Sequence, residues 1–245
     1  MLCQMVKRTA HKNNLWTKIG VFALLLGAGY FVWHQYHLYV NNGFHIPIIE
    51  NRPESFNTFG IDISHHQGEI DWENVLVKNE LDSIISFVYF KVSEGIDHKD
   101  TRWNEHRKTL RSFNKKAGAY HFFLPKKDAL LQAKNFLENY EYQSGDLPPV
   151  LDVEIEGESD VQLIENMKIW LKEVERKSKI QPIIYTSLHF YESKFQQEFL
   201  NHKLWIASYS RMPNLENDKR IIIWQYSEKG KLPGFLGDVD LNVSR

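Results

Sequence analysis

The sequence predicts an α/β protein, an irregular TIM-like (β/α) barrel preceded by an N-terminal transmembrane helix. From residue 59 onward, eight short apolar runs alternate with longer amphipathic stretches, which favours a closed barrel over an open sheet. Near the N-terminus, an uncharged apolar run follows a basic segment, as in membrane anchors. A chain of 245 residues is long enough for one barrel of this kind.

The N-terminal apolar run covers residues 19–33 and carries no charge. Its fifteen residues are fewer than the roughly 20 that cross a bilayer, but flanking tryptophan and tyrosine side chains lengthen the effective span. Basic residues and no acidic residue precede the run, which predicts a cytoplasmic N-terminus and an exported remainder. Because no small-residue cleavage site follows, we expect an uncleaved signal anchor rather than a cleaved signal peptide or a buried core helix.

These features divide the chain into a basic cytoplasmic segment (1–18), a single-pass signal anchor (19–40), a linker (41–58) and the barrel (59–245). We expect the barrel to lie outside the cytoplasm, in the periplasm or outside the cell. Cys3 is the only cysteine and would stay on the cytoplasmic side, so the exported part is held together without disulfides. The 30 basic and 31 acidic residues nearly balance, which gives no reason to expect a nucleic-acid partner. We expect a monomer.

The strand candidates are short runs of aliphatic and β-branched residues bounded by Gly, Pro or polar residues. They cover residues 59–64, 86–92, 118–123, 149–154, 182–186, 204–208, 221–226 and 239–243. Helices are predicted between several of them, at residues 102–116, 127–142, 160–179 and 191–200. In the third helix, apolar residues recur at helical spacing behind Ser159 or Asp160, either of which can cap it. The weaker helical patterns near the C-terminus predict an irregular barrel.

The fourth strand candidate ends in two carboxylates one residue apart, Asp152 and Glu154. Side chains alternate along a strand, so both point to the same side, with Cα atoms roughly 6.5–7 Å apart. Carboxylates this close cannot both ionise freely, so one proton is shared or one pKa rises. Such a pair can supply a general acid and an ionised partner at neutral pH. The alternative is a strand end whose acids cap the next helix or pair with Lys and Arg.

Polar and aromatic side chains also end the other strand candidates. The chemistry of a β/α barrel lies at the C-terminal ends of its strands, so these side chains should converge on one rim. They are Asp62 and Ser64, Lys91, Ser93 and Glu94, Tyr120 and His121, Tyr185, Trp205, Gln225 and Tyr226, and Asp238 and Asp240. Any one of them could simply terminate its strand, but acids and aromatics together on one rim are what a glycosidase needs.

Five ordered motifs resemble those of the glycoside hydrolase family 25 lysozymes, the Chalaropsis-type N-acetylmuramidases. The resemblance runs from residue 59 to 244 in the family's order. It is carried by Gly60-Ile-Asp62-Ile-Ser64-His-His-Gln67-Gly68-Glu-Ile-Asp71-Trp72, Phe90-Lys91-Val-Ser93-Glu94-Gly95, Ala117-Gly118-Ala-Tyr120-His121-Phe122, Leu151-Asp152-Val-Glu154, and Trp224-Gln225-Tyr226 with Val239-Asp240-Leu-Asn242. One departure follows Ser-Glu-Gly, where the family often has an aromatic residue and this chain has Ile96-Asp97-His98.

The resemblance implies a peptidoglycan hydrolase, a muramidase that cleaves the β-1,4 bond between N-acetylmuramic acid and N-acetylglucosamine. Carried over by position, Glu154 is the general acid that protonates the leaving oxygen, and Asp152, Asp62 and Asp240 are the other acids of the site. Asp152 would either polarise a substrate N-acetyl group acting as internal nucleophile or activate a water molecule. Strand spacing leaves both open. The family's similarity to substrate-assisted glycosidases favours the first.

Weaker candidates for the glycan-binding groove are Glu94, Tyr120, Tyr185, Trp205 and Gln225. A core or supporting role is as compatible with these five. His65, His66 and His121 raise the question of a metal site, but adjacent histidines point in different directions and the family needs no metal, so we expect neither metal nor cofactor. Two other functions stay open, a glycan-binding barrel with weak turnover and a hydrolase of a related N-acetylated glucan such as chitin. Four retained acids argue against the binder.

Overall fold

The computed structural model describes residues 19–20, 22, 25–34, 53–78 and 84–245. The chain forms two compact units, residues 1–43 and 44–245. In the first unit the described residues are helical and exposed. No helix in the described part of the chain is long and apolar enough to cross a membrane. The predicted segment 1–18 lies outside the described residues, as do parts of the predicted anchor (19–40) and linker (41–58).

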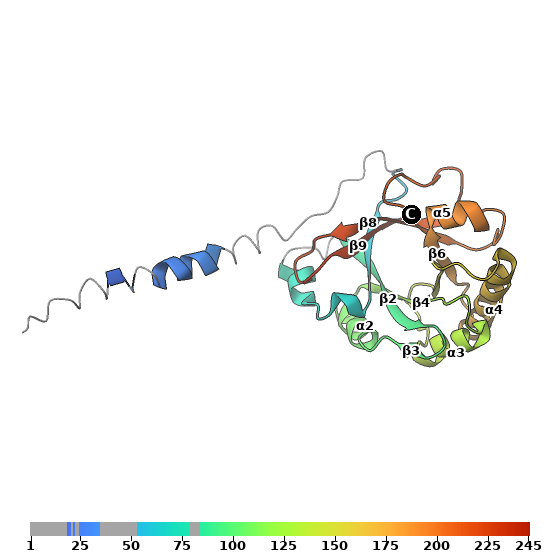
Figure 1. The fold of residues 1–245 in the computed structure, drawn as a ribbon, viewed down its shortest axis with the longest axis horizontal. Helices are drawn as coiled ribbons and strands as arrows, with labels where there is room; N and C mark the ends of the chain where they lie inside the picture. The colour runs from blue at the N-terminus through green and yellow to red at the C-terminus, as the bar shows by residue number, and fades with distance from the viewer. Residues whose placement is uncertain (1–18, 21, 23–24, 35–52, 79–83) are drawn as a thin grey trace, which may run out of the picture. The chain divides into compact units, whose positions relative to one another are not determined.

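The second unit is a closed barrel of eight strands with helices around it (Figure 1). The strand order is β1-β9-β8-β7-β6-β5-β4-β2, and the pairing of β1 with β2 closes the ring, while β3 adds to β2. The strands are β1 (Thr58–Ile63), β2 (Ile85–Glu94), β3 (His98–Lys99), β4 (Lys116–Phe122), β5 (Val150–Asp152), β6 (Ile183–Ser187), β7 (Leu204–Ala207), β8 (Ile221–Gly230) and β9 (Val239–Ser244). The predicted barrel and its eight strands are confirmed. The two-residue β3 was not predicted.

Seven of the barrel strands are parallel, whereas β9 runs antiparallel to both of its neighbours, β8 and β1. The reason is its connection. Residues 231–238 lead from β8 into β9 without a crossover helix, and a short connection of this kind can join only antiparallel strands. The beginning of β9 therefore lies at the rim where the parallel strands end.

Helices α3 (Ala129–Asn139) and α4 (Asp160–Ser178) begin at capping side chains, of which Ser159 was predicted from the sequence. Ser159 Oγ accepts a hydrogen bond from Gln162 N (3.2 Å) at the start of α4, and Asp128 Oδ1 accepts one from Leu131 N (2.8 Å) at the start of α3. Helix α2 covers Trp103–Ser112. The face that α4 buries is made of Leu163, Met167, Trp170, Leu171 and Val174.

The fourth predicted helix, at 191–200, is wrong in extent. Its place is taken by the short helix α5 (Leu188–Phe190) and a π-helical turn, η4 (Tyr191–Phe195). Phe199 has a φ of 52°, a left-handed conformation that cannot continue a right-handed helix. Two further short pieces lie between β1 and β2. They are η1 (His65–Gln67) and the π-helical η2 (Asn74–Lys78).

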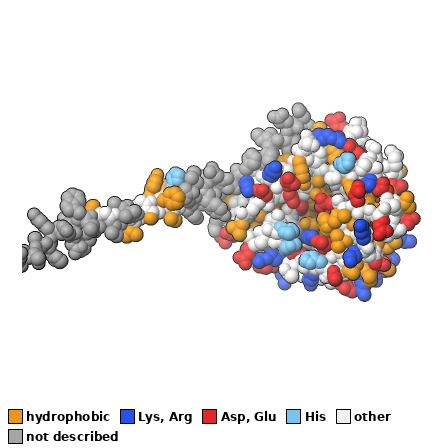
Figure 2. Space-filling view, viewed as in Figure 1, with side chains coloured by type: hydrophobic (Ala, Val, Ile, Leu, Met, Phe, Trp, Pro, Cys, Tyr) orange, Lys and Arg blue, Asp and Glu red, His pale blue; other side chains and the backbone are white. Residues whose placement is uncertain are grey.

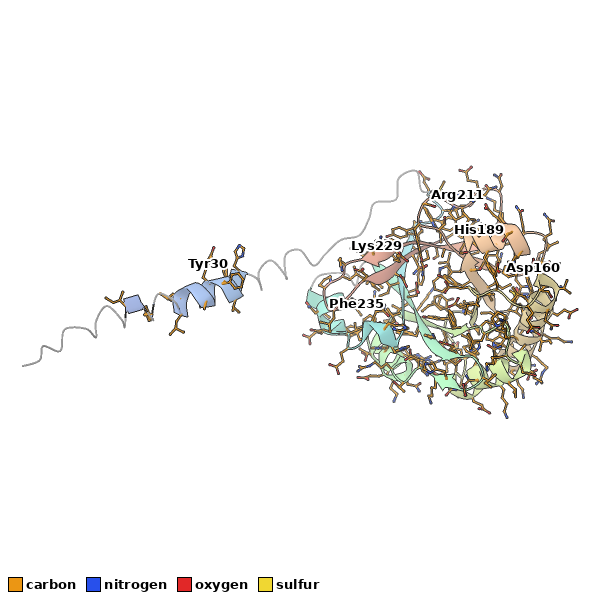
Figure 3. All side chains as sticks on the ribbon, in the orientation of Figure 1. Tyr30, Asp160, His189, Arg211, Lys229 and Phe235 are labelled. Atoms are coloured by element: carbon orange, nitrogen blue, oxygen red, sulfur yellow. The ribbon has the colours of Figure 1, made fainter. Side chains whose placement is uncertain are left out.

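Apolar side chains fill both the inside of the barrel and the layer between strands and helices (Figure 3). The inner cluster contains Phe87, Tyr89, Val150, Ile183, Tyr185, Trp205, Ala207 and Ile223. Two glycines of the family-like motifs make room for it. A Cβ atom at Gly60 would overlap the ring of Phe87, and one at Gly118 would overlap the ring of Tyr89. The outer cluster reaches back to Phe56, within the segment predicted as linker.

Charges of both signs are interspersed on the face of the barrel unit seen in Figure 2. A few acids are buried instead, and one of them lies far from the strand ends. Asp146 is buried and accepts hydrogen bonds from the guanidinium groups of Arg107 and Arg111, from Tyr140 Oη (3.1 Å) and from Gln143 N (3.0 Å). This acid ties α2 to the segment that leads into β5.

Candidate active site

Strand β5 delivers the two carboxylates of the Asp-x-Glu motif to one rim of the barrel. Its end is fixed on both sides, because Phe123 N donates to Asp152 O and Val153 N donates to Tyr185 O, both at 2.9 Å. The strand ends at Asp152, and Glu154 follows two residues later. Asp152 is only 5% exposed, whereas Glu154 is open to solvent. The two acids therefore differ in their access to water.

A cavity of about 210 Å³ lies at this rim. Eight of the nine predicted site residues line it, namely Asp62, Tyr120, Asp152, Glu154, Tyr185, Trp205, Gln225 and Asp240. Val150, Tyr209 and Glu228 complete the lining. A larger groove of about 1040 Å³ lies on the outer wall between α2, α3 and α4, but it contains none of the four predicted acids. The smaller cavity is therefore the candidate active site, because it is the one lined by the predicted acids.

Asp62 and Asp240 form a second carboxyl pair in this cavity. They are direct cross-strand partners on β1 and β9. Burial raises the pKa of Asp62 to about 6, although hydrogen bonds from Asn242 and Gln225 act in the opposite direction. Burial, followed by the negative charges of Asp62 and Glu228, raises the pKa of Asp240 to about 8. Near neutral pH this pair holds one proton.

Two amide side chains donate to the same oxygen of Asp62. Asn242 Nδ2 lies 2.7 Å from Asp62 Oδ2, and Gln225 Nε2 lies 2.9 Å from it. The side-chain oxygens of Asn242 and Gln225, which point away from Asp62, also accept hydrogen bonds. Trp205 Nε1 donates to Asn242 Oδ1 (2.8 Å), and the hydroxyl groups of Tyr185 and Tyr209 donate to Gln225 Oε1 (2.9 and 2.7 Å). The side chains of Gln225 and Asn242 are almost fully buried.

The Asp152–Glu154 pair is the other source of protons. Burial is the largest cause that raises the pKa of Asp152 well above its usual range, and the negative charge of Glu154 adds to it. The pKa of Glu154 is also raised, chiefly because protein atoms surround its carboxyl at the cavity mouth and displace water. Lys91 lowers the pKa of both groups without cancelling these effects. Asp152 Oδ1 is buried and has no hydrogen-bond partner among the described residues, which fits a carboxyl that carries a proton.

Glu94 is the predicted site residue that does not line the cavity. Its carboxylate lies 2.5 Å from Lys91 Nζ, and Lys91 in turn lies over the ring of Phe122, 4.7 Å from its centroid. Glu94 therefore holds the cation that acts on Asp152 and Glu154. Tyr120 does line the cavity, and burial together with the charges of the surrounding aspartates raises the pKa of its hydroxyl, which stays protonated.

Sequence reasoning missed Tyr209 and Glu228 as site residues. Tyr209 follows the strand candidate 204–208 directly, so the rule that selected strand-end aromatics could have found it. Its side chain is 50% exposed, and its hydroxyl is bound to Gln225. Glu228 was missed because the predicted strand stops at residue 226, whereas β8 continues to Gly230.

Of the three histidines singled out in the sequence, His65 and His66 lie side by side with ring centroids 4.1 Å apart, whereas His121 has other partners. His121 is fully buried, with Nδ1 2.8 Å from Ser93 Oγ and Nε2 3.3 Å from Gln132 Oε1, and burial lowers its pKa to about 3. His65 Nδ1 lies 3.2 Å from Asp100 Oδ2 on the rim. Within the described part of the chain, no group of three or more His, Cys, Asp or Glu side chains is arranged to hold a metal ion.

Residues 61–235 match the family described as "Glycosyl hydrolases family 25". This chain belongs to that family. The "Uncharacterized protein YegX" of Escherichia coli (strain K12) is 33% identical to it over 192 residues, covering 78% of this chain and 71% of that protein. "Lysozyme M1" of Streptomyces globisporus is 30% identical over 203 residues, covering 75% of this chain and 66% of that protein.

Solved structures give the same relationship. The bacterial lysozyme from Streptomyces coelicolor superimposes with a TM-score of 0.66 at 26% identity, covering 77% of this chain and 92% of that chain. The resemblance to family 25 lysozymes predicted from the five motifs is confirmed at the level of the family. The matched residues include the ends of β1, β2, β4, β5 and β8, and so most of the strand ends that form the acidic cavity.

Proposed function

We propose that this family 25 protein is a peptidoglycan hydrolase, a muramidase that cleaves the β-1,4 bond between N-acetylmuramic acid and N-acetylglucosamine. One observation carries the proposal. The cavity holds a buried carboxyl, Asp152, beside a solvent-facing one, Glu154, and both have raised pKa values. A glycosidase needs such a pair in order to keep a transferable proton near neutral pH.

The difference in access to water assigns the roles within the pair. Glu154 faces the solvent, where a glycan strand would lie, so it is the general acid that protonates the leaving oxygen. Asp152 lies beneath it and holds the shared proton while the site is empty. Once Glu154 takes that proton, Asp152 is left as an anion that can orient a substrate N-acetyl group or a water molecule. The cavity gives no reason to choose between these two partners.

We further propose a single-pass signal anchor at residues 19–40 with a cytoplasmic N-terminus. The basic residues before the apolar run and the aromatic residues beside it support this proposal. The barrel would then lie outside the cytoplasm, where peptidoglycan is found, and would act as a monomer tethered near the wall. A peptidoglycan hydrolase on the cytoplasmic side would have no substrate.

The experiment is digestion of purified peptidoglycan by the full-length protein in mild detergent, followed by mass spectrometry of the new reducing ends. A muramidase leaves N-acetylmuramic acid at the reducing end, and Glu154→Gln is the inactive control. Chitin oligosaccharides in a parallel digest test the related N-acetylated glucan. N-acetylglucosamine at the new reducing ends, or no new ends with the wild-type protein, would contradict the proposal.

A further inference from the structure

Two hydrogen-bond chains end on one oxygen of Asp62, and together they fix the charge of the second carboxyl pair. We propose that these chains hold the negative charge on Asp62 and the proton on Asp240, which makes Trp205 a positioning residue rather than a glycan contact. The consequence for catalysis rests on the muramidase function proposed above. The location of the negative charge on Asp62 and of the proton on Asp240 does not depend on that function, and it can be measured without any substrate.

The first chain has a fixed polarity. An indole N–H can only donate, so the Asn242 atom that faces Trp205 Nε1 at 2.8 Å must be the amide oxygen. The amide nitrogen of Asn242 then points at Asp62 Oδ2, 2.7 Å away, and donates to it. Trp205 and Asn242 are both buried, at 1% and 0% exposure, so no water competes for either contact. By fixing the orientation of the Asn242 amide, the Trp205 indole therefore makes Asp62 Oδ2 the acceptor of a hydrogen bond.

The second chain reinforces the first. Gln225 Nε2 donates to the same oxygen at 2.9 Å, while Gln225 Oε1 accepts from the hydroxyl groups of Tyr185 and Tyr209. A phenol hydroxyl can also accept a hydrogen bond, so these tyrosines alone do not fix the amide. Because Trp205 has already made Asp62 Oδ2 an acceptor, Gln225 must present its nitrogen to that oxygen and its oxygen to the tyrosines.

The rest of the cavity lining offers no other support for a negative charge. The titratable groups that face the pair are Asp152 and Glu154 beyond β5, Glu228 on β8, Tyr120 on β4, Tyr185 on β6 and Tyr209 beyond β7. All of these are acids or phenols, and none of the described Lys, Arg and His residues lines the cavity. The two amide donors are therefore what stabilises the anion at Asp62, since hydrogen bonds to the charged form favour that form. The proton of the pair is left to Asp240.

This division would give each acid a separate task. A carboxylate at Asp62 places a fixed negative charge in the cavity, where positive charge develops on the sugar ring in the transition state. A neutral Asp240 beside it can donate a hydrogen bond to a sugar oxygen. If the proton changed places, the anion would sit on the more accessible β9 side and the two amide donors would face a neutral group.

The test is a carboxyl ¹³C NMR titration of the full-length protein without substrate, with Asp62 and Asp240 assigned from their Asn variants. In the wild type, Asp240 should be the last of the two to ionise. In Trp205→Phe, Asn242 loses the contact that orients its amide, and its hydrogen bond to Asp62 is weakened. The Asp62 midpoint should then rise by about one pH unit, because a hydrogen bond to a charged group contributes roughly that much. The acid limb of the kcat/KM profile should rise with it.

Trp224→Phe is the matched control. It also removes a buried indole N–H, but Trp224 Nε1 donates to the backbone oxygen of Ser208 (2.9 Å) rather than to an amide side chain that binds Asp62. Both midpoints should stay at their wild-type values. An Asp62 midpoint that stays unchanged in Trp205→Phe, or a wild-type proton located on Asp62, would overturn the proposal. If Trp205→Phe does not fold, Gln225→Met decides in its place, because it removes one of the two donors to Asp62 Oδ2; an upward shift of the Asp62 midpoint supports the proposal and an unchanged midpoint overturns it.

Discussion

Asp62 on β1 and Asp240 on β9 are direct cross-strand partners, and they meet because β9 runs antiparallel to β1. Asp240 is the second residue of its strand, whereas Asp62 is the second-last residue of its own. In a fully parallel barrel these positions would lie at opposite ends. The reversal of one strand therefore adds Asp240 to the rim that already holds Asp62, Asp152 and Glu154, and the cavity contains two carboxyl pairs instead of one.

The first prediction concerns the general acid. Glu154→Gln should keep the fold and glycan binding but lower kcat by roughly 10²–10⁴-fold, because the side chain keeps its shape and loses its transferable proton. Turnover of purified peptidoglycan measures kcat, and a pull-down with the same material measures binding. Wild-type rates in this variant would falsify the role assigned to Glu154.

The second prediction concerns the partner of the acid. Asp152→Asn should lower kcat and move the alkaline limb of the pH–rate profile to lower pH. In the wild type the pair keeps one proton until high pH, because the ionised form of one acid raises the pKa of the other. Without the second carboxylate, Glu154 loses its proton earlier as the pH rises. An alkaline limb in its wild-type position would mean that the two carboxyls titrate independently.

The third prediction concerns the anchor. The full-length chain should stay in the membrane fraction after high-salt and carbonate washes, because the apolar run and its aromatic flanks insert into the bilayer. Added protease should reach the barrel from outside the cytoplasm. Exchange of Lys7, Arg8, Lys12 and Lys18 for neutral residues should weaken this orientation. A soluble protein whose mature N-terminus lies between residues 29 and 51 would instead show a cleaved signal peptide.

The sequence was sufficient for the barrel because strands buried on both faces appear as continuous apolar runs, and all eight were located this way. It could not give the direction of β9, because the apolar pattern of a strand is the same in either direction. That direction depends on residues 231–238, which carry turn and loop residues but no pattern that excludes a crossover. The position of Asp240 at the strand start was the one available clue.

The roles of individual site residues were harder to predict. Trp205 and Glu94 were weaker groove candidates for which a core or supporting role was equally compatible. In the structure the Trp205 ring is buried and its N–H binds Asn242. Glu94 is paired with Lys91, three residues earlier. A strand-end position predicts that a residue lies near the rim. Whether its polar atom meets substrate or another side chain depends on long-range contacts, such as the one between Trp205 and Asn242, that no local pattern contains.

The fourth prediction concerns a buried acid outside the site. Asp146→Asn should lower the free energy of unfolding by about 3 kcal/mol, because removing one partner of a buried ion pair leaves the other charge uncompensated. Arg107, whose side chain is 8% exposed, would lose its carboxylate, and Arg111 would lose its 2.6 Å contact. Urea unfolding followed by tryptophan fluorescence measures the change. A loss below about 0.5 kcal/mol would mean that water replaces the carboxylate.

The last prediction is that Asp240→Asn raises the free energy of unfolding at alkaline pH, whereas Asp146→Asn lowers it. The folded pKa values of Asp62 and Asp240, about 6 and about 8, lie above the ordinary value of 3.8. For acids with a raised folded pKa, stability is fully present below the unfolded pKa and is lost as the pH rises through the folded values. The wild-type free energy of unfolding should therefore fall as the pH rises from about 4 to above 8. Asparagine cannot ionise, so the variant should escape the later part of this loss.

At pH 9 the Asp240→Asn variant should be more stable than the wild type by on the order of 2 kcal/mol, a figure reduced from the full shift because Asp240 is partly exposed. At pH 4, close to the unfolded pKa of 3.8, the two proteins should differ least, because the loss of wild-type stability develops only as the pH rises above that value. Urea titrations at the two pH values measure the difference, with Asp146→Asn as the comparison that loses stability at both. Equal stability of variant and wild type at pH 9 would show that Asp240 ionises there without cost, and that its carboxyl is not held against the charge of Asp62.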